Sequence, residues 1–449
     1  MRQRVVYWVM IEALVGLTSI SAQEVKKWTL NDCIEYALEK NIQLQQSQIA
    51  GRESEVDVRS ARAALFPNLS FSTGQNVTNR PYQEKSSTVS GTEIISSNNK
   101  TTYNGSYGLN AQWTLWDGNQ RRNTLKQKKA SRQIAELEVA HTANSLQEQI
   151  AQLYIQVLYA EESVKVNRQT LEVSQATFER GKVLFQESNL SKANCAQLEA
   201  QVGNDHYQLV TAENALRNYR LQLKQLLELE PDVELELVLP ADTDGEVLQP
   251  LPSCQEVYQQ ALALRPEIQS SKLSVENARL NIAVAKGGYS PTLSLNASAG
   301  SMTNSASSQS WSRQMKDGWN NSIGLTVSIP LFDNRQRKSA LQKARLQYDS
   351  SVLESVNQQK ALYKSIESLW MEASSAQQQY VAADSKLASC RTSYKMVSEQ
   401  FDLGMKNTLE LLTEKNNLLS AQQQRIQAKY MAMLNETLLD FYAGQPMKL

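Results

Sequence analysis

The side chains that most often carry chemistry are few in this sequence. Its two histidines, His141 and His206, stand apart from the cysteines and carboxylates that would complete a metal site. The four cysteines are also far from one another and form no Cys-x-x-Cys pair, which argues against a zinc site and against a dense disulfide framework: Cys33, Cys195, Cys254 and Cys390. The motifs of nucleophilic, zinc-dependent and phosphate-binding enzymes are missing. We predict a protein that is not an enzyme and uses no metal or cofactor.

Composition points to long helices. The 449 residues include 46 basic and 46 acidic side chains, so the net charge is zero and nucleic-acid binding is not expected. Only 7% of residues are aromatic, and 17 Gly and 10 Pro are few for this length. Gln, Ala, Ser, Leu and Glu are abundant instead, which is typical of extended helices.

The first residues have the three-part layout of a secretory signal peptide. A basic start, Met1-Arg2-Gln3-Arg4, precedes an apolar stretch from Val5 to Ile20 and small residues at Ser21 and Ala22. We predict a signal peptide over residues 1–22 and a mature chain that begins near Gln23. No later window resembles a transmembrane helix, so the exported chain either stays in the periplasm or spans a membrane as β-strands.

The mature chain contains two copies of one unit. Adding 224 to the numbers of five residues of the first copy gives identical residues in the second, at Ala261, Leu262, Pro291, Leu293 and Ser294. Further along the offset is 216, which maps Gly108, Leu109 and Asp117 onto Gly324, Leu325 and Asp333. We assign residues 23–229 to the first repeat, residues 230–253 to a linker with four prolines and a short strand, and residues 254–449 to the second repeat.

Each copy begins with a helix and continues with two strands. The helices are predicted over residues 30–64 and 255–287, and each ends where Pro67 or Pro291 forces extended geometry. Apolar and polar residues then alternate around Leu69 and Leu293, and again over residues 103–115 and 323–331. Polar loops, about 78–102 and 303–317, join the strands of each pair.

Alternation over about ten residues indicates either a half-buried sheet or membrane strands that face lipid on one side. We favour the membrane because aromatic residues cluster near the strand ends: Tyr103, Trp113, Trp116, Trp311, Trp319 and Phe332. The smallest membrane barrels have about eight strands. Four strands in one chain therefore require several chains in one barrel.

Long helical hairpins complete both copies. Proline-free helical patterns run over residues 119–186 and 335–402, and at 1.5 Å per residue each spans on the order of 100 Å. Each pattern breaks once, near Glu187 and at Leu403-Gly404, and a second helix returns over residues 191–229 and 408–442. Since the offset of 216 continues through both breaks, we expect the hairpins to end at the same depth.

These features together resemble the TolC-like outer membrane efflux proteins, also called outer membrane factors. The resemblance rests on the duplication and on five short motifs in a fixed order: Phe66-Pro67 and Ser290-Pro291 at the strand entries, Leu115-Trp116-Asp117-Gly118 and Leu331-Phe332-Asp333-Asn334 at the strand-to-helix junctions, and Phe401-Asp402-Leu403-Gly404 at the second tip. It implies an α+β membrane protein whose antiparallel helical hairpins form an α-barrel below a shared transmembrane β-barrel with four strands from each chain.

The resemblance also implies a function and partners. It suggests a homotrimeric exit duct of a tripartite efflux or type I secretion system, set in outer-membrane lipid with its helical tunnel in the periplasm. A periplasmic adaptor protein and an inner-membrane pump of the RND or ABC type would be its partners. The adaptor would meet the hairpin tips: Glu187, Ser188, Asn189, Leu190, Leu403, Gly404, Met405 and Lys406.

In this family, acidic residues just past the second tip constrict the periplasmic entrance. Counting from Gly404, the first such position is Glu410, and the next is Thr413, with Glu414 beside it. The related position of the first copy is Asn194, and Ser188 replaces the tip glycine there. The sequence thus departs from the two-acid pattern. Glu410 is either one member of an acidic ring or an ordinary solvated carboxylate.

The competing interpretation is a structural or adhesive envelope protein built on long coiled coils. Strand pairs in the middle of each repeat argue against it, because a stalk has no use for lipid-facing strands there. A duct would need its energy from a partner, since the sequence has no nucleotide-binding motif.

Overall fold

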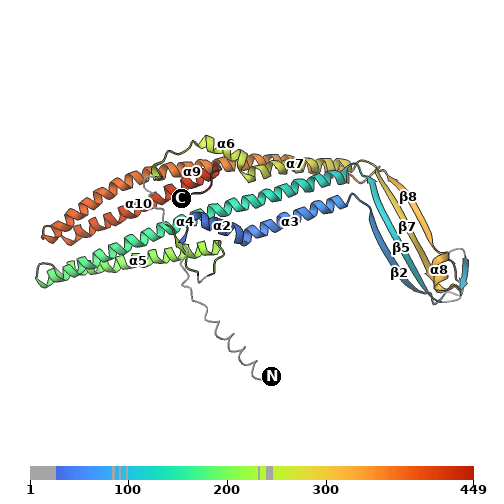
Figure 1. The fold of residues 1–449 in the computed structure, drawn as a ribbon, viewed down its shortest axis with the longest axis horizontal. Coiled ribbons are helices and arrows are strands. Elements are labelled where there is room, and N and C mark those ends of the chain that lie inside the picture. Colours follow the sequence, from blue (N-terminus) through green and yellow to red (C-terminus); the bar gives the residue numbers. More distant parts are fainter. Residues whose placement is uncertain are drawn as a thin grey trace, which may run out of the picture. The chain divides into compact units, whose positions relative to one another are not determined.

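A computed structural model describes residues 27–82, 86–90, 93–97, 100–230, 233–238 and 246–448 (Figure 1). The predicted signal peptide, residues 1–22, lies outside these residues. The chain divides into two compact units. We call them the helical unit (Met1–Gln45, Thr142–Leu264 and Leu362–Leu449) and the sheet unit (Gln46–His141 and Arg265–Ala361). Neither unit coincides with one sequence repeat, because both draw on both copies.

The order of elements follows the predicted repeat. In the first copy it is α2 (Leu30–Lys40), α3 (Ile42–Ala63), β2 (Asn68–Asn79), β5 (Thr101–Trp116), α4 (Gln120–Gln186) and α5 (Lys192–Leu226). In the second copy it is α6 (Cys254–Leu264), α7 (Pro266–Gly287), β7 (Thr292–Asn304), β8 (Asn320–Ser328), α9 (Gln336–Asp402) and α10 (Thr408–Tyr442). The long helices α4 and α9 have 67 residues each, and the returning helices α5 and α10 have 35 each. The two hairpins are therefore matched in length.

The first helix of each copy is interrupted, where we had predicted a continuous one. Asn41 separates α2 from α3 with an extended backbone (ψ 127°), and its side chain caps the next helix by accepting a hydrogen bond from the Leu44 amide at 3.1 Å. Its amide nitrogen also donates to the Leu226 carbonyl at 3.0 Å. At the related position Arg265 precedes Pro266, whose ring disfavours helical geometry at the residue before it. Hydrophobic periodicity reveals neither break.

The four long strands form one antiparallel sheet in the order β2-β5-β7-β8. The register places apolar residues in rows across one face, for example Leu69, Ala111, Ala297 and Ile323. The neighbouring row on the other face is polar: Ser70, Asn110, Ser298 and Ser322, with the last two hydroxyls 2.7 Å apart. The alternation predicted from the sequence thus separates an apolar face from a polar one.

The junction motifs are tight turns from strand to helix. Gly118 and Asn119 in the first copy, and Asn334 and Arg335 in the second, have positive φ. Asp117 accepts hydrogen bonds from the Arg121 amide at 3.2 Å and from its side chain at 2.8 Å, and Asp333 holds Arg337 in the same way. A Cβ on Gly118 would lie 2.5 Å from the Gly287 carbonyl oxygen, so this turn leaves no room for a side chain.

Both loops between the strands and the end of β8 differ from the predicted ones. Part of the first loop forms a hairpin, β3 (Ser86–Ser90) with β4 (Glu93–Ser97), and part of the second is a short helix, α8 (Trp311–Asp317). Strand β8 ends at Ser328 and not at Leu331, since Pro330 has no amide hydrogen to continue the ladder. The short strand of the linker is β6 (Glu236–Leu237), which pairs in parallel with β1 (Lys27–Trp28).

The core of the helical unit is a set of helix seams. In the first hairpin Val164, Leu171 and Leu209 are buried against one another. Tyr154, which is also buried, donates a hydrogen bond from its hydroxyl to the Val238 carbonyl at 2.8 Å and so ties the linker to α4. Among the described helices, none has both the length and the hydropathy that crossing a membrane requires.

Candidate functional site

The two hairpin tips have the same backbone conformation. At the first tip the Asn189 amide donates to the Leu184 carbonyl at 2.8 Å, and at the second the Met405 amide donates to the Gln400 carbonyl at 2.9 Å. This closing bond is typical of a helix end with one left-handed residue. That residue is Gly404 in the second tip (φ 74°) and Ser188 in the first (φ 63°). Ser188 thus takes the tip glycine's place in conformation as well as in sequence.

The returning helices begin with equivalent caps. Ser191 caps α5 by accepting a hydrogen bond from the Asn194 amide at 3.2 Å, and Asn407 caps α10 by accepting one from the Glu410 amide at 2.9 Å. Asn194 and Glu410 therefore occupy the same position, three residues past the cap. The Glu410 carboxylate also accepts from the Asn407 amide at 3.1 Å, which completes a capping box.

Glu410 is held by a lysine at the second tip. Lys406 Nζ lies 2.5 Å from Glu410 Oε1, and both side chains are about two-fifths exposed, at 37% and 40%. The hydrogen bond from Lys406, followed by the one from the Asn407 amide, lowers the pKa of Glu410 below its ordinary value. The carboxylate is therefore ionised and partly balanced by its own chain. Its role in an acidic ring stays a prediction.

The other predicted aperture residues have local partners as well. The Thr413 hydroxyl donates to the Leu409 carbonyl at 2.8 Å, within α10. Glu414 accepts a hydrogen bond from the Asn417 side chain at 3.4 Å. Asn194 is half-buried, whereas Thr413 is exposed. None of these contacts reaches beyond the helix on which the residue lies.

The tips themselves are open to solvent. Glu187, Ser188 and Asn189 are exposed, and Leu190 is half-buried. At the second tip large apolar side chains are exposed: Leu403 by 74%, Met405 by 69% and the neighbouring Leu409 by 66%. Exposed apolar side chains at the end of a hairpin are typical of a surface that another protein covers.

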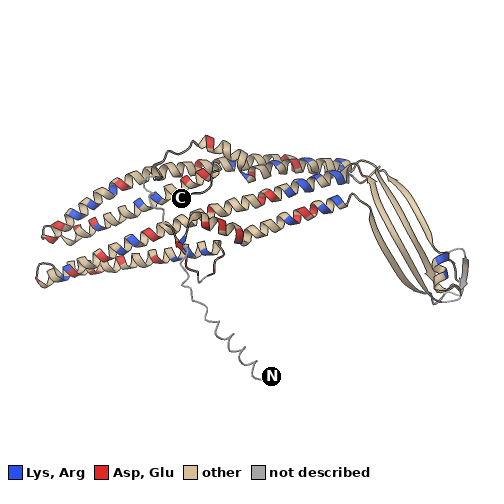
Figure 2. Cartoon of the chain, viewed as in Figure 1, with Lys and Arg blue, Asp and Glu red and all other residues tan. Residues whose placement is uncertain are grey.

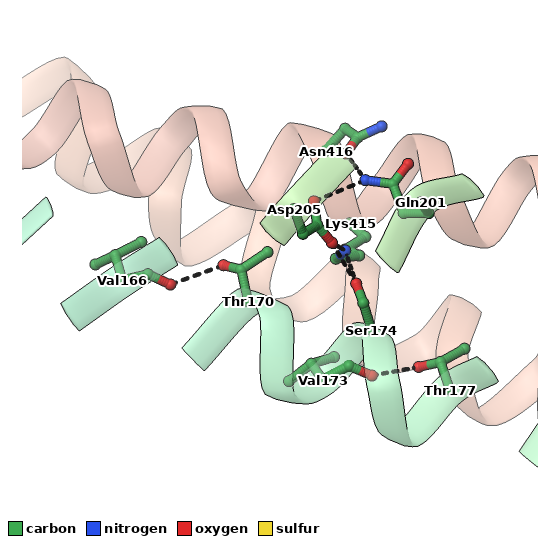
Figure 3. Close-up of polar contacts among 9 residues, drawn as sticks. All are labelled: Val166, Thr170, Val173, Ser174, Thr177, Gln201, Asp205, Lys415 and Asn416. Atoms are coloured by element: carbon green, nitrogen blue, oxygen red, sulfur yellow. Dashed lines mark hydrogen bonds and ion pairs between the residues drawn. The ribbon is translucent and has the colours of Figure 1, made fainter. Parts of the chain in front are cut away.

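Two sets of contacts join the hairpins within the helical unit, and sequence reasoning missed both. Near the tips, Arg180 Nε of α4 lies 3.0 Å from Asp402 Oδ1 of α9. Further from the tips, Lys415 of α10 reaches Ser174 of α4 and Asp205 of α5 (Figure 3). We call these last three residues the buried polar cluster.

The buried polar cluster is fully enclosed. Ser174, Asp205 and Lys415 are 4%, 2% and 6% exposed. Lys415 donates to the Ser174 hydroxyl and to Asp205 Oδ2, and Ser174 also donates to Asp205 Oδ2. The second carboxylate oxygen of Asp205 accepts from Gln201 at 2.9 Å, and Gln201 reaches Asn416 of α10 at 3.3 Å. Burial lowers the pKa of Lys415, while the bond and charge of Asp205 oppose that shift.

A periodicity signal could have revealed this cluster. The signal is a charged residue at a position that repeats with the buried apolar residues of its helix. Lys415 follows the buried Leu411 by four residues, and Asp205 precedes the buried Leu209 by four, so both stand at seam positions. A charged residue at a seam position needs a partner from the facing helix.

Charge is distributed unevenly between the helices and the four long strands. Lysine, arginine, aspartate and glutamate are spread along the helices, whereas β2, β5, β7 and β8 contain none (Figure 2). Apolar side chains of these strands are widely exposed, such as Phe71 by 67%, Ile323 by 76% and Leu325 by 61%. An uncharged sheet with an exposed apolar face is typical of strands that meet lipid.

A polar cavity of about 430 Å³ lies in the sheet unit and is lined by serines and carboxylates of α4, α7 and α9. In it His141 Nδ1 is 3.5 Å from Glu267 Oε2. Burial pushes the pKa of Glu267 up, but the hydrogen bonds from His141 and the backbone outweigh it and leave the pKa lowered. Within the part of the chain that the structure describes, no group of three or more His, Cys, Asp or Glu side chains is placed to hold a metal ion.

Known proteins resemble this chain in sequence and in fold. A family model described as outer membrane efflux protein matches residues 33–228 and 257–445. The outer membrane efflux protein BepC of Brucella suis biovar 1 is 22% identical over 430 residues, covering 94% of this chain and 88% of that protein. The alkaline protease secretion protein AprF of Pseudomonas aeruginosa is 22% identical over 426 residues, covering 92% and 84%.

The structural comparison agrees with these matches. A crystal structure of CusC superposes with a TM-score of 0.79 at 19% identity and covers 93% of this chain and 92% of that chain. Long helical hairpins with four antiparallel strands are common to both. The fold predicted from the sequence is confirmed.

Proposed function

This chain belongs to the outer membrane efflux protein family, and from that premise we propose that three copies assemble into one duct. The family's function is that of an outer-membrane channel of tripartite efflux or type I secretion systems, and it is the function of this chain. It is a non-enzymatic role in the outer membrane. The predicted family, function and location are therefore confirmed, whereas the number of copies and the partners belong to the proposal.

The observation that carries the assembly is the pair of free sheet edges. Among the described residues, β2 pairs only with β5 and β8 pairs only with β7. An edge strand leaves a row of amide and carbonyl groups that bilayer lipid cannot satisfy. In the proposed homotrimer, β2 of one copy pairs with β8 of the next, so that the shared barrel closes with its apolar face outward and its polar face toward the lumen.

The hairpin tips are the proposed docking surface for a periplasmic adaptor. Each chain would present one apolar and one polar tip. The apolar tip is the second, with the exposed side chains of Leu403 and Met405, and the polar tip is the first, with the equivalent turn at Ser188. An inner-membrane pump of the RND or ABC type would supply the energy and choose the cargo. The name of AprF refers to the secretion of a protease, which fits a conduit whose cargo is set by its partner.

The entrance to the duct lies beside these tips in the proposed assembly. Three copies of Glu410 would surround the axis, and Glu414 would add its negative charge. Thr413 and Asn194 would contribute uncharged side chains to the same ring. Because Lys406 neutralises part of the charge of each Glu410, this ring would hold cations less strongly than free carboxylates would. We propose in addition that residues 1–22 are an export signal and that residues 23–229 and 254–449 are the two repeats.

Conductance tests this function directly. The purified protein, reconstituted in a planar bilayer, is expected to open aqueous channels and to migrate as a trimer before heating. A structural or adhesive fibre would open no channels, although a coiled-coil fibre could also be trimeric. The matched control is the same protein unfolded by heat before reconstitution, which removes the channel without changing the composition. Persistent absence of conductance from a folded trimer would contradict the proposed duct.

A further inference from the structure

The buried polar cluster connects the two hairpins at a point where apolar packing would be expected. Ser174 follows the buried Leu171 by three residues on α4, Asp205 precedes the buried Leu209 on α5, and Lys415 follows the buried Leu411 on α10. All three are seam positions of their helices, and the three side chains meet one another (Figure 3). The polar groups of three helices thus converge on one buried point between the hairpins.

Neighbouring hydroxyls on α4 do not take part. Thr170 and Thr177 lie four residues before and three residues after Ser174, and each donates to a carbonyl of its own helix, at 2.9 Å and 2.8 Å. Ser174 is the one of these three that turns to the other hairpin. The contact therefore depends on a particular residue of α4 facing a particular residue of α10.

A buried charge pair of this kind is sensitive to displacement. A shift by one helical turn, about 5.4 Å, would carry Lys415 away from both acceptors. It would also leave Asp205 buried without its cation, which is costly. Apolar side chains alone tolerate such a shift better, because one leucine can replace another in a seam. The cluster thus penalises every register except the observed one.

The repeat shows that the cluster is specific to one face. The offset of 216 carries Ser174 onto Cys390 and Asp205 onto Ala421, and subtracting 216 from Lys415 gives Glu199. The repeat-related face would therefore bring a glutamate toward a cysteine and an alanine, and no cation would neutralise it. Only one of the two related pairings of the hairpins can form a buried ion pair.

We propose that the buried polar cluster fixes which faces of the two hairpins meet and in which register, so that both tips end at the same depth. Its contribution is to specificity and not chiefly to stability. Ser174, Asp205 and Lys415 act as positioning residues, since they act on the tips through the hairpins. The inference stands on contacts within one chain and does not depend on the cargo or on the partners.

Cross-linking between the hairpins tests the register. Arg180 and Asp402 form an ion pair in the observed register, and Ser398 lies one turn before Asp402 on α9. In full-length protein with Cys195, Cys254 and Cys390 changed to Ser, the pairs R180C/D402C and R180C/S398C are treated with a short bis-methanethiosulfonate reagent. With the cluster intact, we expect the first pair to react at least tenfold faster than the second.

The decisive variant replaces the ion pair by apolar residues of similar size, D205L/K415M. We expect it to keep its helical content and a melting temperature at or above that of the parent, while the tenfold preference falls to less than threefold. The single variant K415M, which leaves Asp205 buried alone, is expected to melt several degrees lower. This contrast separates a loss of register from a loss of folding.

Two outcomes would overturn the proposal. If D205L/K415M retained the full preference for R180C/D402C, apolar packing would set the register without the cluster. If D205L/K415M melted as low as K415M, the cluster would act through stability. Because both readouts are independent of conductance, neither outcome bears on the proposed channel function.

Discussion

Glu410 is a charged residue at the second tip whose contacts come from its own chain. Its carboxylate caps α10 and pairs with Lys406, and these contacts lower its pKa. A carboxylate with a lowered pKa stabilises the folded form above its ordinary pKa, and this contribution is lost as the pH falls through the lowered value. The charge at the tip should therefore persist at a pH where an ordinary glutamate is half protonated.

We expect Glu410→Gln to raise the single-channel conductance for anions or to weaken block by a trivalent cation. The reason is that the substitution removes one negative charge from each copy and leaves Lys406 unpaired. In the parent channel, the block should persist as the pH falls through the ordinary pKa of glutamate and should disappear only at a lower pH, where the lowered pKa of Glu410 is passed. Planar-bilayer recordings over a pH series measure both effects.

The matched control for Glu410 is Glu199→Gln, which removes an exposed carboxylate from α5. It should leave conductance and block unchanged. If Glu410→Gln behaved like this control, Glu410 would lie away from the aperture, and the departure of Thr413 and Asn194 from an acidic pattern would mean that this entrance has no charge ring.

At the scale of elements, the turns of the hairpins offer a prediction about strain. Ser188 holds a positive φ that costs a side-chain-bearing residue about 1–2 kcal/mol, whereas Gly404 holds the same conformation freely. We expect Ser188→Gly to stabilise the first tip by up to about 1 kcal/mol and Gly404→Ala to destabilise the second by about 1 kcal/mol. A Cβ at Gly404 would meet no atom within 4 Å, so that effect is conformational.

Hydrogen exchange of the amides that close the turns measures this strain. Exchange at Asn189 should slow up to about fivefold in Ser188→Gly, and exchange at Met405 should quicken by a similar factor in Gly404→Ala. Each tip serves as the control for the other, because the substitution in one hairpin should leave the other unchanged. Faster exchange at Asn189 in Ser188→Gly would show that the serine side chain supports the turn.

The elements also show how far sequence reasoning reaches. The duplication and the proline-free runs predicted α4 and α9 to within a residue at each end, since both depend on signals that lie along the chain. The breaks at Asn41 and Arg265 were missed, although Pro266 was a visible signal for the second. The break at Asn41 depends on a bond to Leu226, which is distant in sequence and close only in the fold.

The residues of the candidate site also differ in whether a local sequence signal predicts them. The tips and caps were predictable because a glycine, a serine or an asparagine at a turn has a local conformational meaning. The buried polar cluster was not predicted, because Ser174, Asp205 and Lys415 come from three helices and have no motif in common. Each looks like a solvated residue until the seam on which it lies is known.

At the scale of the whole molecule, the sheet must present its apolar face to lipid if three copies close a barrel. On β8, Ile323 and Ser322 are neighbours whose side chains lie on opposite faces. A lysine on a lipid-facing site costs on the order of 2–4 kcal/mol at the bilayer midplane, whereas the lumen face tolerates charge. We therefore expect Ile323→Lys to reduce the heat-resistant trimer in outer-membrane fractions severely.

Ser322→Lys is the control for this prediction, because it places the same charge one residue away on the polar face. It removes the contact between Ser322 and Ser298 but should leave most of the trimer intact, since the lysine would point into water. Equal losses in both variants would mean that neither face meets lipid. A larger loss in Ser322→Lys would reverse the assignment of the faces and, with it, the lumen of the proposed duct.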